Sequence, residues 1–269
     1  MSRAIQAVRL LAARWPRASY LAARLLAWLG QPLGRGVPAE RLAELFPDLP
    51  PAAVRAARRR TWSTYVRGEA LNAAVAVPER RPFYPRSRPH PAVDRLRPPL
   101  IIGAFHVGPY AALGVALRTL PGEVLVVHHG PAASRQDVSL LRVGDSEWER
   151  ARGFHRSVTT LRSGGFVVTA LDGYGGQYGY AGSTVEAPMF GGTATLARGP
   201  FALARITDTP IVLLVGRWRG NSVEVTCGEP LVPGDETTMA AAAAAWLEAY
   251  LREFPGEVSA RTLEILRRG

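Results

Sequence analysis

From residue 100 onwards, short apolar runs alternate with stretches of helical periodicity, and this alternation constrains the fold more than any other feature of the sequence. Apolar runs of strand length lie at 100–105, 122–129, 165–172, 209–218 and 221–231. Stretches with helical spacing lie at 108–120, 134–144, 156–164, 195–208 and 236–253, the last with Thr237 as its expected cap, and a final helix is expected at 256–268. Alternating strands and helices are typical of an α/β domain around a mostly parallel sheet, so we predict that fold for residues 100–269.

Residues 1–77 are predicted to form a helical lead-in, and a connector rich in proline and arginine at 78–99 joins it to the α/β domain. The pattern predicts two amphipathic helices within residues 3–30, broken at Pro16, then a short helix at 38–47 and a long helix at 48–75. The arginine run 58–60 is interpreted as a solvent-facing side of the long helix.

An apolar stripe runs along the helices of residues 3–30, and arginines occupy the other side. One hypothesis places this stripe in a membrane interface, where the arginines reach lipid phosphates. The alternatives are that the stripe packs on the core of the same chain or that it docks on a partner subunit.

The charge balance points to anionic partners. The 269-residue chain has a formal net charge of +11, and all 33 of its basic residues are arginine because the sequence contains no lysine. Such a charge favours a phospholipid surface or an acidic carrier or substrate. Nucleic acid is not expected as a partner, because no recognition motif, zinc-ligand spacing or stacking platform accompanies the arginines.

Cys227 is the only cysteine, which excludes an internal disulfide and a four-cysteine metal site. It lies in a strand-like run, so we predict a buried structural thiol. No uninterrupted apolar run reaches the ~18 residues of a membrane-spanning helix, and arginines interrupt any signal-peptide core near the N-terminus. We therefore expect a cytoplasmic protein, with peripheral attachment to the inner face of the cell membrane left open.

His106 follows the first apolar strand, in the segment "IIGAFHVGPYAALG" (residues 101–114). An imidazole just beyond the carboxyl end of a strand in a parallel sheet is well placed to act as a general base. Such a base usually has a carboxylate that fixes its tautomer. The following helical turn contains no acid. Asp172 ends the run "FVVTALD" at the same edge of the predicted sheet and is the preferred candidate for a substitute acid, ahead of Glu186 and Glu69. For Asp172 itself, a structural or substrate-ordering role is favoured over a catalytic one.

Four segments together resemble a known family. "GAFHVGPYAAL", "VLVVHHG", "LRSGGFVVTALDG" and "APMFGGTATLARGPFALARITDTPIVLLVGRW" follow the order and spacing of the late lipid A acyltransferases, which are related to the mycobacterial phosphatidylinositol mannoside acyltransferases. The similarity covers about residues 5–253, and its most specific part is the Phe-Gly segment "MFGGTATLARGPFALA". It implies an acyltransferase-like α/β fold with a helical, membrane-associated N-terminus.

The resemblance also implies a mechanism. His106 would deprotonate an acceptor hydroxyl, which attacks an acyl thioester on acyl carrier protein, because an alcohol is a weak nucleophile without a positioned base. In the family an acid follows the histidine by five residues, and here Ala111 stands at that position. No cofactor is implied. His128 and His129 are adjacent in a strand and point to opposite faces, so they are not predicted to bind a metal together.

Seven residues are expected to bind substrate. They are Gly108, with backbone amides beside it, Tyr110, His129, Tyr174 in a Gly/Tyr loop, Phe190 and Gly191 of the Phe-Gly segment, and Arg198, which could bind an anion at a helix N-terminus.

Two functions remain open. The first is transfer of an acyl group from a thioester to a hydroxyl or amine of a glycolipid or specialised metabolite. The second is a divergent protein that uses His106 for another base-dependent step on a carrier-bound substrate in natural-product biosynthesis, or that serves as a subunit of a heteromeric enzyme. Ala111 and the segment 254–269, which lacks the family's Trp-rich ending, favour the second function; His106, Asp172 and the Phe-Gly segment favour the first.

Overall fold

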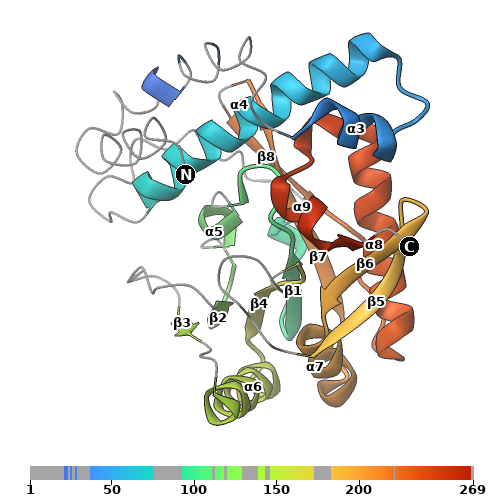
Figure 1. Cartoon of the computed structure of the whole chain (residues 1–269). Helices are drawn as coiled ribbons and strands as arrows, with labels where there is room; N and C mark the ends of the chain where they lie inside the picture. The colour runs from blue at the N-terminus through green and yellow to red at the C-terminus, as the bar shows by residue number, and fades with distance from the viewer. Residues whose placement is uncertain are drawn as a thin grey trace.

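The computed structural model describes residues 21–23, 25, 28, 37–75, 93–110, 113–117, 120–128, 139–142, 146–172, 183–220 and 222–267. Their fold is α/β, as predicted, and is built on a six-stranded sheet in the order β3-β2-β4-β1-β7-β8 (Figure 1). The strands are β1 (Leu100–Ala104), β2 (Val124–His128), β3 (Ser139–Arg142), β4 (Phe166–Ala170), β7 (Ile211–Arg219) and β8 (Ser222–Cys227). All neighbours are parallel except β8, which runs antiparallel to β7.

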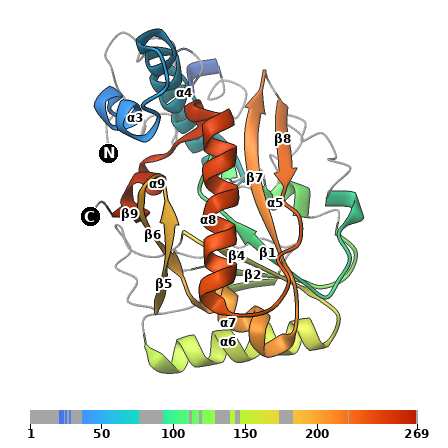
Figure 2. The same cartoon turned by 90° about the vertical axis from the view of Figure 1, so that its right-hand side faces the viewer.

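Helices cover both faces of this sheet because its central strands are apolar on both sides. Leu100 and Ile102 belong to one buried cluster together with residues of α5 (Leu113–Ala116), whereas Ile101 belongs to a second cluster on the other face. That second cluster includes residues of α6 (Glu147–Arg162), α7 (Gly199–Thr207) and α8 (Glu236–Glu253). Figure 2 shows α8 lying across this face of the sheet.

A second, three-stranded antiparallel sheet was not expected from the sequence. It consists of β5 (Thr184–Met189), β6 (Gly192–Ala197) and β9 (Leu266–Arg267), in that order. The helix predicted at 195–208 therefore begins later, as α7, where Pro200 at its first turn favours helix initiation. Thr193 and Thr195 alternate along β6, which is typical of a strand and unfavourable for a helix.

Three further expectations were wrong in detail. The stretch predicted as a helix at 134–144 contains β3, which pairs in parallel with β2. Helix α8 is capped by Asp235, whose side chain accepts a hydrogen bond from the backbone N–H of Thr238, and not by Thr237. The final helix expected at 256–268 is instead a 3₁₀ turn η6 (Pro255–Glu257), the short helix α9 (Ala260–Ile265) and β9.

The helical lead-in matches its prediction where it is described. Helices α3 (Ala39–Leu45) and α4 (Pro51–Val75) correspond to the expected helices at 38–47 and 48–75. Most of residues 3–30 and of the connector lie outside the described residues. The exceptions are five residues between 21 and 28, and connector residues 93–99, which begin with the 3₁₀ turn η2 (Val93–Arg95). No helix in the described part of the chain is long and apolar enough to cross a membrane.

The described residues between 21 and 28 are helical, and they divide between two sides. Ala23 is fully buried against Trp62, Val66 and Ala70 of α4. The side chains on the other side, of Leu21, Leu25 and Trp28, are 64%, 56% and 65% exposed. The helix therefore packs on α4 through its small residue and leaves large apolar side chains uncovered.

Candidate functional site

The strand register brings His106 and Asp172 together. β1 and β4 are parallel neighbours in which Ala104 pairs with Ala170, and the pairing continues as the backbone N–H of Leu171 donates to the carbonyl oxygen of Ala104 over 2.9 Å. His106 and Asp172 each follow two residues after these paired alanines. Because parallel strands end at the same edge of a sheet, the two side chains meet beyond it.

The carboxylate of Asp172 holds His106 through both of its oxygens. Asp172 Oδ1 lies 2.8 Å from His106 Nδ1, and Asp172 Oδ2 accepts a hydrogen bond of 2.8 Å from the backbone N–H of His106. The Asp172 side chain is 1% exposed, whereas that of His106 is 33% exposed. Since Nδ1 faces the carboxylate, Nε2 is the imidazole nitrogen that can accept a proton from a substrate.

Opposing influences set the pKa of His106. Burial lowers it, but the negative charge of Asp172 and its hydrogen bond raise it by more, so the pKa lies above the ordinary 6.5. Two smaller influences oppose each other: the charge of Arg261 lowers the pKa of His106, and the charge of Glu264 raises it. The imidazolium formed by proton transfer is therefore stabilised by the carboxylate, as a general base requires.

Arg261 supports this arrangement from the C-terminal segment. Its Nε donates to the backbone carbonyl oxygen of Asp172 over 2.9 Å, and its Nη1 donates to the carboxylate of Glu264 over 2.7 Å. Sequence reasoning missed Arg261, because it lies 89 residues beyond Asp172 on the short helix α9 and no motif marks it.

Gly108 and Tyr110 lie next to His106, as the sequence suggested for substrate contacts. The ring of Tyr110 packs edge-on against the imidazole with 4.8 Å between ring centroids, and Tyr110 is 41% exposed. Gly108 has φ +60°, and a Cβ there would lie 2.0 Å from the carbonyl oxygen of Gly216 on β7. The loop that carries His106 thus contacts the neighbouring strand closely enough to require glycine.

A buried ion pair lies beneath the same loop. Glu257 of η6 is 1% exposed, and its Oε2 would be 3.1 Å from a Cβ on Gly108. Its Oε1 accepts a 3.0 Å hydrogen bond from Nε of Arg60 on α4, and Thr64 is 3.5 Å from its Oε2. Burial raises the pKa of Glu257, while the charge and hydrogen bond of Arg60 act in the opposite direction. The pair connects the helical lead-in, the C-terminal segment and the His106 loop.

The Phe-Gly segment forms a turn away from this site. Phe190 and Gly191 connect β5 to β6 with φ values of 51° and 69°. The backbone N–H of Phe190 donates to Glu248 of α8, and its ring packs edge-on against Phe46, the residue that follows α3. The other end of β6 contacts Leu171, and the strand extends about 17 Å from that end to the turn. The described contacts of these two residues are therefore structural.

Arg198 also has an ion-pair partner outside the His106 site. Its Nε donates to Glu236 at the start of α8, and Arg205 donates to the same carboxylate over 3.0 Å. The hydrogen bond from Arg198 and the burial of Glu236 have opposite effects, and the net result is a lowered pKa for Glu236. His129, Tyr174 and Ala111 lie outside the described residues, so their predicted places in the site stay predictions.

Replacing Gly108 with alanine tests the close approach to β7. We expect a loss of about 2–4 kcal/mol in the free energy of unfolding, because the new Cβ would combine left-handed backbone strain with overlap on the Gly216 carbonyl. Gly220→Ala is a matched control: it has the same φ of +60° but open space around its Cβ, so about 1 kcal/mol is expected. Urea unfolding measures both, and equal losses would show that strain alone matters.

The described residues contain no group of three or more His, Cys, Asp or Glu side chains placed to hold a metal ion. Cys227 is half-buried on β8, and burial raises the pKa of its thiol to about 11, so little reactive thiolate forms at neutral pH. The sequence matches no model of a known protein family and no curated protein.

Proposed function

We propose that the protein transfers an acyl group from a thioester donor to a hydroxyl or amine acceptor, with His106 as the general base. The contact between His106 and Asp172 carries this proposal. A partly exposed imidazole whose Nδ1 faces a buried carboxylate can take a proton through Nε2 and become a stabilised cation.

Each atom is accounted for in the proposed step. His106 Nε2 removes the proton of the acceptor as its oxygen or nitrogen attacks the thioester carbonyl carbon. The tetrahedral intermediate then collapses, the carbon–sulfur bond breaks, and the imidazolium returns the proton to the leaving thiolate. The products are the acylated acceptor and the free thiol of the donor.

The resemblance to the lipid A acyltransferases supports the same reaction. In that family the acid follows the histidine by five residues, where this chain has Ala111. Asp172 approaches the imidazole from the neighbouring strand β4 and supplies a carboxylate at hydrogen-bonding distance. The proposed base therefore keeps an orienting acid that comes from a different element.

The test compares wild-type protein with His106→Ala in the presence of acyl-carrier-protein thioesters, and intact mass spectrometry follows loss of the acyl group. We expect hydrolysis or transfer in the wild type and none in His106→Ala. His155→Ala is the matched control, because His155 is exposed on α6 and its turnover should equal that of the wild type. Folded wild-type protein without turnover on any thioester would overturn the proposal and favour another base-dependent step.

We further propose that the helix around residues 21–28 attaches the protein peripherally to an anionic membrane. Support comes from the exposed side chains of Leu21, Leu25 and Trp28 together with the net charge of +11. Apolar side chains on a basic protein suit the boundary between acyl chains and anionic headgroups.

Trp28→Ser tests this attachment by co-sedimentation with vesicles that contain phosphatidylglycerol. We expect vesicle binding to weaken about tenfold, because an exposed indole is lost from the interface. Trp148→Ser is the control, since Trp148 is 74% exposed but lies on α6 at the opposite end of the molecule (Figure 1). If both variants bind vesicles like the wild type, the helix is not the attachment site.

A further inference from the structure

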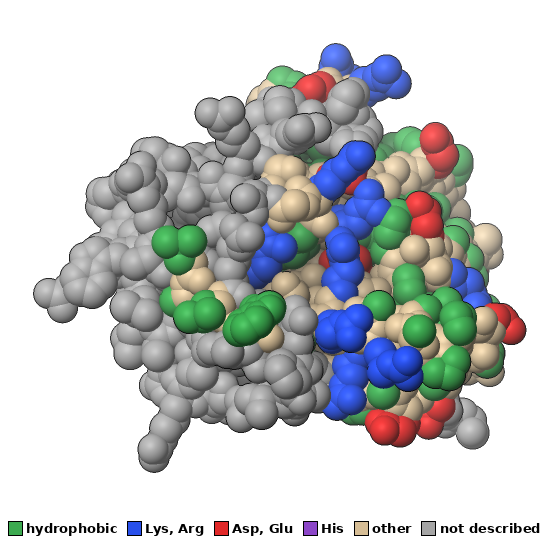
Figure 3. Space-filling model, turned by 90° about the horizontal axis from the view of Figure 1, so that it is seen from above, with side chains coloured by type: hydrophobic (Ala, Val, Ile, Leu, Met, Phe, Trp, Pro, Cys, Tyr) green, Lys and Arg blue, Asp and Glu red, His purple; other side chains and the backbone are tan. Residues whose placement is uncertain are grey.

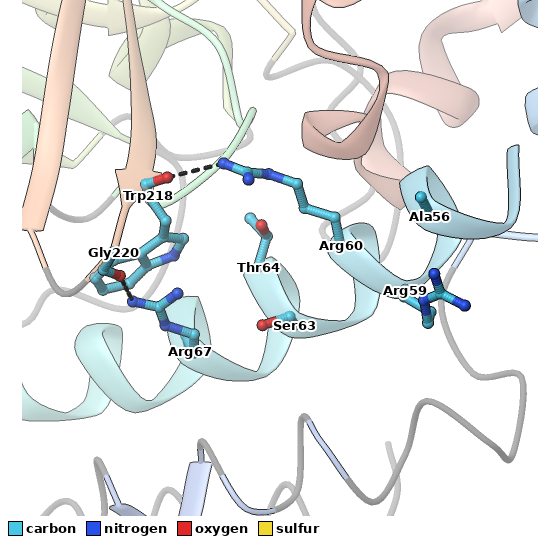
Figure 4. Close-up of a pocket in the computed structure, with 8 residues that line it drawn as sticks. All are labelled: Ala56, Arg59, Arg60, Ser63, Thr64, Arg67, Trp218 and Gly220. Atoms are coloured by element: carbon cyan, nitrogen blue, oxygen red, sulfur yellow. Dashed lines mark hydrogen bonds between the residues drawn. The ribbon is translucent and has the colours of Figure 1, made fainter. Parts of the chain in front are cut away.

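A pocket of about 390 Å³ lies between α4 and the end of β7, outside the His106 site (Figure 4). Its lining includes three arginines, Arg59, Arg60 and Arg67, and two hydroxyl side chains, Ser63 and Thr64. None of the eight lining residues is acidic. A hollow lined by guanidinium and hydroxyl groups is chemically suited to an anion.

Helical spacing gathers these side chains on α4. Residues 59, 60, 63, 64 and 67 recur at intervals of three or four, so they share one face of the helix. The arginine run 58–60 faces solvent in part, as the sequence suggested: Arg59 and Arg60 are both exposed, but the guanidinium of Arg60 also donates to the buried carboxylate of Glu257.

Two of the guanidinium groups are held in place before any ligand arrives. Arg60 donates to Glu257 and to the carbonyl oxygen of Trp218, the latter over 2.8 Å. Arg67 donates to the carbonyl oxygen of Gly220 over 2.6 Å and lies over the Trp218 ring at 3.9 Å. Figure 4 shows both side chains extending from α4 towards this end of β7. Fixed side chains lose less conformational entropy when they bind a ligand.

The charged side chains that line the pocket are all arginines. Glu257 offsets the charge of Arg60, but it is buried behind the pocket wall with none of its side chain exposed. Arg59 and Arg67 add two more guanidinium charges to the lining. Seen from above, where α4 lies, arginine side chains also gather in a row on the surface, with few acidic side chains between them (Figure 3).

We propose that this pocket binds a phosphate group, carried either by a membrane lipid headgroup or by a soluble phosphate ester. Guanidinium groups match the oxygens of phosphate with paired, charge-assisted hydrogen bonds, and the hydroxyls of Ser63 and Thr64 supply further polar contacts. A hollow of about 390 Å³ leaves room for part of the molecule that carries the phosphate.

The test uses a double variant, Arg59→Gln with Arg67→Gln, and leaves Arg60 intact because it holds Glu257. The matched control is Arg152→Gln with Arg162→Gln: both arginines are exposed on α6, at the far end of the molecule, and the net charge changes equally. Thermal unfolding is followed against increasing inorganic phosphate, with acetate and chloride at matched ionic strength.

Phosphate should stabilise the wild type and the control variant more than acetate or chloride does. In the pocket variant the apparent dissociation constant for phosphate should rise about tenfold, because charged hydrogen bonds are lost. Equal phosphate binding in the pocket variant, equal weakening in the control, or equal stabilisation by acetate would each overturn the proposal.

Two arms identify the source of the phosphate. One measures co-sedimentation with phosphatidylcholine vesicles with and without phosphatidic acid, and the other measures binding of glycerol 3-phosphate. Weaker binding of the pocket variant to phosphatidic acid vesicles alone assigns the pocket to a lipid headgroup. Weaker binding to glycerol 3-phosphate alone assigns it to a soluble ester, and weaker binding to both assigns it to the phosphate group itself.

Discussion

Asp172→Asn is expected to lower the rate of acyl transfer by about 10²- to 10⁴-fold while substrate binding changes little, since the lost interaction is strongest with the imidazolium. Asp172 holds His106 by two contacts of 2.8 Å, one to the ring and one to the backbone N–H. Asparagine keeps the shape but removes the charge. The measurement is kcat and KM with an acyl-carrier-protein thioester. A rise in KM with unchanged kcat would contradict this role.

The pH dependence separates an orienting carboxylate from a merely structural one. A general base works when deprotonated, so kcat/KM should rise with pH through the pKa of His106, which lies above 6.5 in the wild type. In Asp172→Asn the two largest raising influences, the charge and the hydrogen bond of the Asp172 carboxylate, are lost or weakened while the lowering effect of burial remains, so the rise should move to lower pH. A rise at unchanged pH in the variant would show that Asp172 does not act on the imidazole.

Arg60→Ala is expected to destabilise the fold by about 2 kcal/mol at neutral pH. Removing one partner of a buried ion pair usually costs more, about 3–5 kcal/mol, but Arg60 is 49% exposed and solvent screens its charge. The cost arises because Glu257, with 0% of its side chain exposed, loses its countercharge. Urea unfolding of the full chain measures the change.

The sign of the pH effect identifies the cause. Burial already raises the pKa of Glu257, and loss of Arg60 should raise it further. A carboxyl with a raised folded pKa destabilises the protein as pH rises, so the loss in Arg60→Ala should be larger at about pH 8 than at about pH 5. The double variant Arg60→Met with Glu257→Gln should recover most of the stability. A loss that is independent of pH would point to packing instead.

The sequence predicted the elements of the site better than their connections. The apolar runs of β1 and β4 were recognisable because strands buried on both faces are continuously hydrophobic, and each ends before a polar residue, His106 or Asp172. Their contact depends on the strands being neighbours in register, which no local pattern encodes. The β5–β6 hairpin was missed because the glycine and alanines of β6 dilute the strand signal of Thr193 and Thr195.

Other contacts could not be predicted from the hydrophobic periodicity of the sequence. Arg60 and Glu257 are 197 residues apart, and in the sequence each resembles an ordinary surface charge. The pocket beside Arg60 was missed for the same reason, since it requires α4 to lie against the end of β7. Long-range pairs of charged residues are set by tertiary packing, which a single sequence does not reveal.

The contact between Arg261 and the carbonyl of Asp172 also has a consequence for biosynthesis. The ribosome must add 89 residues after Asp172 before this contact can form, and Glu257 is made almost as late. A nascent chain that already contains both His106 and Asp172 therefore lacks the supports on either side of them. During translation, the proposed base lacks the support of Glu257 and Arg261 until synthesis has passed residue 261.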